Sequence, residues 1–312
     1  MFPYHRKAIS CVAQAAAVAA PLVAFAAAHA EMTAPAPFVA PDVTPAAASS
    51  APATAIPAII PAPAKSAAAP APAAALAAAP VACTAPAEFS HLNLPLAHTA
   101  RRIASGKPLT VVAVGSSSTA GAGASSPSAS YPSRLAVELD KRFAPEGVTV
   151  FNRGVNGEET SDMMARFENG VIAEHPQLVL WQVGTNSVLR DHPLAPHATQ
   201  LHEGIEELKA SGADVVLMDL QYSPRVIAKT ETLDMVDQIA LTAKEENVDL
   251  FRRFAMMRAW YEEQHLPFDV FVSPDGLHMN DWGYACVAKV LARGIAEAAT
   301  RPIASAAAHA PR

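Results

Sequence analysis

Leu109-Thr-Val-Val-Ala-Val-Gly115 is followed at once by Ser116-Ser117-Ser118-Thr119-Ala120-Gly121. A near-continuous run of Val and Leu is typical of a parallel strand that is buried on both faces. The loop after it lacks the GK[ST] of a P-loop and the GxGxxG spacing of a dinucleotide site. It is not a GxSxG elbow either, because Thr119 stands where the second Gly should be. Taken alone, such a loop is most often only a turn.

Further apolar runs predict four more strands, at residues 148–152, 178–183, 215–220 and 248–251. Amphipathic stretches predict helices between and after them, at residues 132–143, 161–175, 197–210, 232–246 and 281–298. Strand alternating with helix in this way predicts an α/β fold of three layers, with a five-stranded parallel sheet in the middle. Ligands of such sheets bind at the carboxyl ends of the strands, so functional residues are expected in the loops that follow them.

Polar residues that complement a serine occur in three other loops. The second predicted strand leads into Asn152-Arg-Gly-Val-Asn-Gly157-Glu158, and the third leads into Gly184-Thr-Asn186-Ser187. A glycine N–H and an asparagine carboxamide are neutral donors of the kind that stabilise an oxyanion. Before the last predicted helix lies Asp275-Gly-Leu-His278, in which the carboxylate can orient the imidazole toward a serine.

The four segments, in this combination and order, resemble the SGNH subgroup of the GDSL family of serine esterases. In that family the blocks carry Gly-Asp-Ser-Leu, a Gly, Gly-x-Asn and Asp-x-x-His. The resemblance covers nearly the whole part of the chain that is predicted to fold, and it implies a flavodoxin-like hydrolase fold. It also implies a catalytic triad of Ser117, His278 and Asp275, an oxyanion hole formed by Ser117, Gly157 and Asn186, and no need for a cofactor or a metal.

Two positions depart from the family pattern. Ser116 replaces the Asp of the first block, and Ser187 replaces the Asp that often follows the Asn of the third block. Neither is the expected nucleophile or base, so the hydrolase prediction stands while the substrate and the subfamily stay open. Among the three adjacent serines, the Gly-x-Ser alignment and the trailing Thr-Ala-Gly favour Ser117. Ser116 is the first alternative, and Ser118 is the second.

Three residues in the strand-end loops are candidates for substrate binding. Arg190 follows the third predicted strand, and Tyr222 and Arg225 follow the fourth. An arginine near the site would suit an anionic or sugar-linked acyl substrate, and the alternative is an ordinary solvated side chain. Trp181, at the end of a buried strand, is expected in the core.

No metal site is expected among the histidines. The nearest cluster contains Asp191, His192, His197 and His202. A spacing of five residues turns a helix by roughly 140° per step, so these side chains diverge and do not converge on one ion.

The charge and the cysteines exclude several classes of protein. Lys and Arg number 23 against 29 Asp and Glu, a net charge of -6 without a block of like charges, which argues against a nucleic-acid partner and against an electrostatic membrane-surface binder. Three cysteines are too few for a disulfide scaffold. Cys83 and Cys286, which remain if residues 1–30 are removed, either form a disulfide that pins the entry of the folded domain or stay as two thiols.

The two ends of the chain are predicted to lie outside the folded domain. Residues 1–30 carry Arg6 and Lys7, an apolar run and an Ala-x-Ala site ending at Ala30, as in a secretory signal peptide, with an uncleaved anchor as the alternative. Residues 31–89 are rich in Pro and Ala and predict a disordered linker. A hydrolase domain at 90–299 and a disordered tail at 300–312 follow. We therefore expect an exported protein, periplasmic or secreted, without stable membrane insertion once the signal is cleaved.

Together these features predict an exported serine esterase. It would hydrolyse carboxylic esters through an acyl-enzyme and remove short acyl groups from a carbohydrate or a cell-envelope glycan, and its partner would be that acylated small molecule or glycan. An acyltransferase to a glycan hydroxyl would use the same residues, and a non-catalytic glycan-binding module is the alternative from another class. A thioesterase or lipase is disfavoured, because no lid-like apolar segment lies between the predicted strands.

Overall fold

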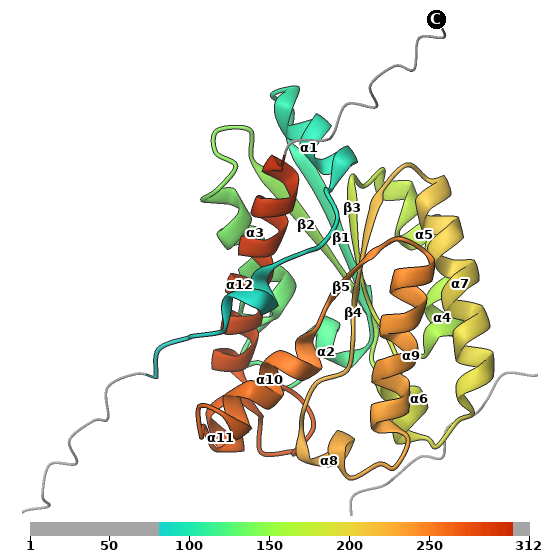
Figure 1. Ribbon diagram of the computed structural model, residues 1–312. Coiled ribbons are helices and arrows are strands. Elements are labelled where there is room, and N and C mark those ends of the chain that lie inside the picture. Colours follow the sequence, from blue (N-terminus) through green and yellow to red (C-terminus); the bar gives the residue numbers. More distant parts are fainter. Residues whose placement is uncertain (1–80, 302–312) are drawn as a thin grey trace, which may run out of the picture. The chain divides into compact units, whose positions relative to one another are not determined.

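Five strands form one parallel sheet in the computed structural model, which describes residues 81–301. They are β1 (Leu109–Gly115), β2 (Val148–Gly154), β3 (Leu178–Gln182), β4 (Asp214–Met218) and β5 (Asp249–Phe251). Their order in space is β2-β1-β3-β4-β5 (Figure 1), which is the flavodoxin-like order. The predicted α/β class and the five-stranded parallel sheet are confirmed.

The sheet places β1 between β2 and β3. Leu109 pairs with Val148, and the register continues until Gly115 pairs with Gly154. On its other side, β1 pairs with β3 from Val111 onward. β1 and β3 are buried almost throughout, as their Val and Leu content predicts, and Trp181 lies in the core as expected.

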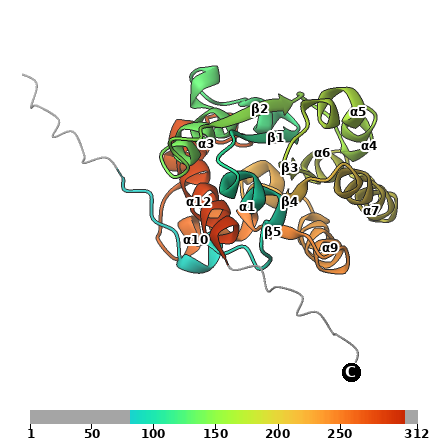
Figure 2. The ribbon, with the colours of Figure 1, turned by 90° about the horizontal axis from the view of Figure 1, so that it is seen from above.

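Helices cover both faces of the sheet (Figure 2). α3 (Tyr131–Asp140) and α12 (Asp281–Thr300) pack together on one face, and α7 (Leu194–Ala210) and α9 (Thr232–Glu245) pack together on the other. Within residues 81–301, no helix combines the length and the hydropathy that crossing a bilayer requires.

The helices differ from the predicted ones at three places. The stretch expected as one helix at 161–175 is divided into α4 (Thr160–Met164), α5 (Phe167–Gly170) and the 3-10 turn η3 (Ile172–Glu174). Arg166 interrupts it with non-helical backbone angles, and its guanidinium bonds Glu158. The sequence pattern also missed α1 (Ala97–Ala104) and α10 (Arg253–Glu262).

Short elements occupy the connections at the strand ends. α2 (Ser117–Ala120), α6 (Thr185–Leu189) and α8 (Pro224–Ile227) follow β1, β3 and β4 and lie at the same end of the sheet (Figure 1). η2 (Pro127–Ala129), α11 (Phe268–Phe271) and η1 (Ala87–Ser90) complete the described elements.

Residues 81–93, here called the N-terminal strap, run along α12. Cys83 forms a disulfide with Cys286 of α12. Trp282 Nε1 donates to Val81 O at 2.8 Å, and Trp260 Nε1 donates to Thr84 O at 3.0 Å. Residues 81–89, which the sequence analysis placed in the linker, therefore contact the folded domain.

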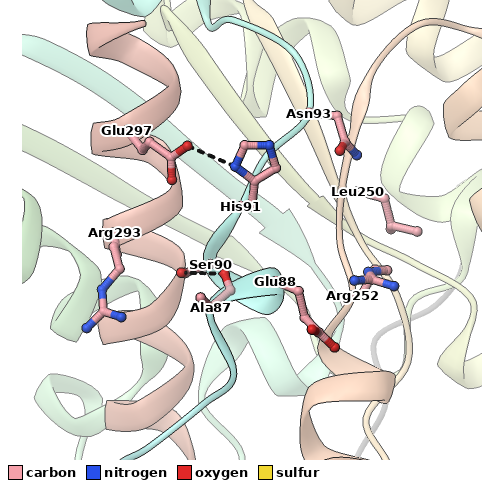
Figure 3. A pocket seen from close by; sticks show the side chains of 9 residues that line it. All are labelled: Ala87, Glu88, Ser90, His91, Asn93, Leu250, Arg252, Arg293 and Glu297. Carbon is pink, nitrogen blue, oxygen red and sulfur yellow. Dashed lines mark hydrogen bonds and ion pairs between the residues drawn. The ribbon is translucent and has the colours of Figure 1, made fainter.

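The strap also borders a hollow of about 760 Å³ (Figure 3). His91 reaches Glu297 of α12 at 2.8 Å across one side of it, and Arg252 and Arg293 lie on opposite sides. None of the predicted site residues lines this hollow. The predicted signal, the linker up to residue 80 and the tail from residue 302 lie outside the described residues.

We expect the disulfide to stabilise the fold without taking part in activity. It joins residues 203 positions apart, and closing a long loop restricts the unfolded chain most strongly. Reduction, or Cys83→Ser, should lower the free energy of unfolding by about 2–5 kcal/mol, measured by urea denaturation. The reductant should leave Cys83→Ser itself unaffected, and equal stability of the oxidised and reduced wild type would contradict the prediction.

Candidate active site

A hydrogen-bonded chain of three side chains lies at the carboxyl end of the sheet. Ser117 Oγ and His278 Nε2 are 2.8 Å apart, and His278 Nδ1 is 2.5 Å from Asp275 Oδ2. Ser117 begins α2 directly after β1, whereas His278 and Asp275 come from the loop before α12. The structure thus brings the three predicted triad residues together in the order serine, imidazole, carboxylate.

Close packing fixes the turn that carries Ser117. α2 lies so near the end of β2 that a Cβ added to Gly154 would be 2.1 Å from the backbone nitrogen of Ala120. Only glycine allows that approach. Tyr284 OH of α12 donates to Ala122 O at 2.6 Å, which holds the far side of the same turn.

The loop that carries Asp275 and His278 is closed on itself. Ser273 N–H donates to His278 O at 2.8 Å, and Asp275 Oδ1 accepts from Ser273 Oγ at 2.7 Å and from the N–H of Leu277 at 2.9 Å. Burial would raise the pKa of the Asp275 carboxyl, but its hydrogen bonds to His278, Ser273 and Leu277 outweigh burial and hold that pKa well below its usual range. Asp275 is therefore ionised near neutral pH.

The two other oxyanion candidates lie on adjoining loops. Asn186 Nδ2 donates to Glu158 O at 2.7 Å, which ties the start of α6 to the residue after Gly157. Gly157 has a φ of 82°, a conformation that favours glycine. Val155 N–H donates to Gly115 O at 3.0 Å, which places the Gly157 loop beside the turn of Ser117. Within residues 81–301, the N–H groups of Ser117 and Gly157 have no acceptor.

Ser187, which stands where the family often has an Asp, contacts the carboxylate of Glu159. Ser187 Oγ donates to Glu159 Oε2 at 2.9 Å, Arg190 donates to Oε1 at 2.5 Å, and His192 Nδ1 lies 2.9 Å from Oε2. Burial would raise the pKa of Glu159, but the hydrogen bonds from His192, Arg190 and Ser187 lower it below its usual value. The carboxylate beside the oxyanion loops thus comes from Glu159, a residue that the sequence analysis did not single out.

Ser116, which stands where the family has an Asp, contacts the side-chain amide of Gln182. Its Oε1 lies 3.0–3.2 Å from four donor atoms of the serine turn: Ser116 N, Ser116 Oγ, Ser118 Oγ and Thr119 Oγ1. Ser116 and Ser118 are buried and face this amide, whereas Ser117 faces His278. Of the three adjacent serines, Ser117 alone has the imidazole as its partner.

The three predicted substrate-binding residues lie in different surroundings. Arg190 donates to Gly157 O at 2.8 Å as well as to Glu159, so it braces the oxyanion loop. Tyr222 is buried, stacks on Phe268 and donates its OH to Glu262. Arg225 is exposed, and its backbone N–H donates to Gly276 O at 3.0 Å, beside Asp275.

The clustered histidines have separate partners. His192 contacts Glu159, His197 contacts Gln238, and His202 contacts Glu246. Within the described part of the chain, no three His, Cys, Asp or Glu side chains are placed to hold a metal ion.

The chain is similar in sequence to two esterases. It is 26% identical over 173 residues to a protein named acetylxylan esterase from Geobacillus stearothermophilus, covering 51% of this chain and 78% of that protein. It is 34% identical over 79 residues to an arylesterase from Vibrio mimicus, covering 25% of this chain and 40% of the arylesterase.

Solved structures share the fold at lower identity. A two-domain esterase active on acetylated mannans superposes with a TM-score of 0.60 at 18% identity, over 70% of this chain and 58% of that one. The acetylxylan esterase of Geobacillus stearothermophilus gives a TM-score of 0.51 at 21% identity, over 60% and 94%. A GDSL-like lipase from Parabacteroides merdae gives 0.54 at 17% identity, over 61% and 96%.

Residues 82–301 match the profile of the Non-GDSL lipase-like family. The match covers more than half of the chain and extends from the N-terminal strap to the end of α12. The predicted resemblance to SGNH and GDSL-like esterases is confirmed. The chain belongs to the Non-GDSL lipase-like family.

Proposed function

We propose that this carboxylic ester hydrolase is an exported serine esterase that removes short acyl groups, above all acetyl, from a carbohydrate. The observation that carries the proposal is the continuous contact from Ser117 through His278 to Asp275. Such a chain activates a hydroxyl that is a weak nucleophile on its own.

Each residue has a role in the proposed acylation step. Ser117 Oγ attacks the ester carbonyl carbon while His278 Nε2 takes the hydroxyl proton. The carbonyl electron pair moves onto oxygen, where the N–H groups of Ser117 and Gly157 and the carboxamide of Asn186 stabilise the negative charge. When the tetrahedral intermediate collapses, His278 returns the proton to the leaving alcohol, and the acyl group stays on Ser117.

Deacylation repeats these steps with water as the nucleophile. His278 removes a proton from the water, the water oxygen attacks the acyl carbon, and the carboxylic acid leaves as Ser117 regains its proton. Asp275 accepts a hydrogen bond from the Nδ1–H of His278 in both steps and stays ionised, which selects the useful tautomer and stabilises the imidazolium. The lowered pKa of Asp275 supports this role, because the carboxylate is charged near neutral pH and can stabilise the imidazolium when it forms.

The names of the relatives support the substrate class. An acetylxylan esterase and an esterase active on acetylated mannans both act on acetylated polysaccharides, while the arylesterase indicates that a simple aryl ester is a useful assay substrate. Export is supported by the signal-like residues 1–30 and by the disulfide, because disulfides persist in oxidising compartments.

Replacement of the triad should abolish turnover. Ser117→Ala and His278→Ala should each lower kcat on an aryl acetate by several orders of magnitude. The double variant should be little worse than either single one, because the residues act as a unit. Ser116→Ala is the matched control and should keep most of the activity. Wild-type turnover by Ser117→Ala would contradict the assignment of the nucleophile.

Loss of the Asn186 carboxamide donor should lower the rate of the chemical step and leave substrate binding nearly unchanged. Asn186→Ala should lower kcat about 10²- to 10³-fold while KM changes little, since the carboxamide acts on charge that develops in the transition state. Steady-state kinetics at a temperature where the variant is folded would measure both constants. A change confined to KM would make Asn186 a substrate-binding residue instead.

A substrate panel tests the carbohydrate proposal directly. Released acetate should be detected from acetylated xylo- or manno-oligosaccharides, at a higher kcat/KM than from aryl esters of long acyl chains. Adding deacetylated oligosaccharide to an aryl acetate assay should leave acetate as the product. Acetylated sugar in that second assay would show transfer in place of hydrolysis, and activity confined to long-chain esters would refute the substrate class.

A further inference from the structure

A buried cation lies beneath the loops of the active site. Arg253, the first residue of α10, has no exposed surface. Its guanidinium donates to Ser118 Oγ at 3.0 Å, to Asp219 O at 2.6 Å and to Gln221 Oε1 at 3.0 Å. These acceptors belong to the segments that follow β1 and β4 at the carboxyl end of the sheet.

Gln221 extends these contacts to two more loops. Its Oε1 also accepts from Thr185 Oγ1 at 3.1 Å, and its Nε2 donates to Leu277 O at 3.4 Å. Besides Asp219, the Arg253 and Gln221 pair reaches three residues, and each is the chain neighbour of one site residue: Ser118 of Ser117, Thr185 of Asn186, and Leu277 of His278.

The stability of the fold gives no sufficient reason for this arginine. Within the described residues, the Nε of Arg253 has no hydrogen-bond partner. The nearby Asp219 carboxylate accepts instead from the N–H of Phe254. Burial lowers the pKa of Arg253 and raises the pKa of Asp219 to about 7, and the attraction between the two groups offsets only part of this effect. An apolar side chain of similar volume often stabilises a core as well as a buried charge does.

We propose that Arg253 and Gln221 are positioning residues that hold the loops of Ser117, Asn186 and His278 in register with one another. The inference rests on the proposed function of those three residues. A rigid guanidinium fork and a side-chain amide provide directional bonds that an apolar core lacks. Hydrolysis needs that geometry, because a misplacement of about 1 Å can cost about 10²-fold in rate.

The contacts of Arg253 and Gln221 with Ser118, Thr185 and Leu277, here called the hub, can be weakened by two variants that spare every triad and oxyanion residue. Thr185→Val removes one link with almost no change in shape, and should lower kcat about 10-fold. Arg253→Lys keeps the charge but loses the fork, and should lower kcat about 10- to 100-fold. KM on an aryl acetate should stay within about twofold for both, because the hub does not face the substrate.

Thr99→Val is the matched control. Thr99 is a buried threonine on α1 whose Oγ1 donates to Asp214 Oδ2 at 2.8 Å, at the opposite end of β4. Thr99→Val should lower the melting temperature without lowering kcat. Kinetics should be measured well below each melting temperature, and if Arg253→Lys does not fold, Thr185→Val decides.

The outcomes separate this inference from the proposed function. Wild-type kcat in folded Thr185→Val, with Ser117→Ala inactive, would overturn the positioning role alone. The positioning role would also be overturned if Thr185→Val and Thr99→Val lowered kcat equally for an equal loss of melting temperature. Full activity of Ser117→Ala would overturn the proposed function, and this inference with it.

Discussion

The hydrogen bond between Ser117 and His278 joins residues 161 positions apart and depends on the order of the strands. β1 lies inside the sheet, so the turn after it is surrounded by the loops that follow β2 and β3. α12 packs beside α3 and brings the Asp275 loop to the same end. Every other feature of the site depends on this convergence. The four segments are far apart in the sequence, and the parallel sheet brings the loops that contain them to one edge.

The layer beneath the site is rich in polar side chains, whereas most other buried side chains of the described residues are apolar. Gln182 Oε1 accepts hydrogen bonds from the turn that carries Ser117. Arg253 and Gln221 connect that turn to the other loops. Directional bonds fix geometry more sharply than packing does, at some expense in desolvation. At the two positions that depart from the family pattern, Ser116 donates to Gln182 and Ser187 donates to Glu159.

The elements whose signal is local could be predicted from the sequence. Continuous Val and Leu runs located all five strands to within about two residues, and the order of the blocks identified the residues of the triad contact. The break at Arg166 was missed, and the contact that its guanidinium makes there with Glu158 exists only in the folded chain. The same holds for Arg253, since a sequence pattern treats an arginine as exposed.

The central claim is that Ser117, among three adjacent serines, carries the acyl group. The most direct measurement is mass spectrometry of the protein after reaction with a fluorophosphonate, followed by peptide fragmentation to locate the adduct. We expect one adduct per chain, on Ser117, and none in His278→Ala over the same time. An adduct on Ser116 or Ser118, or labelling that does not depend on His278, would contradict it.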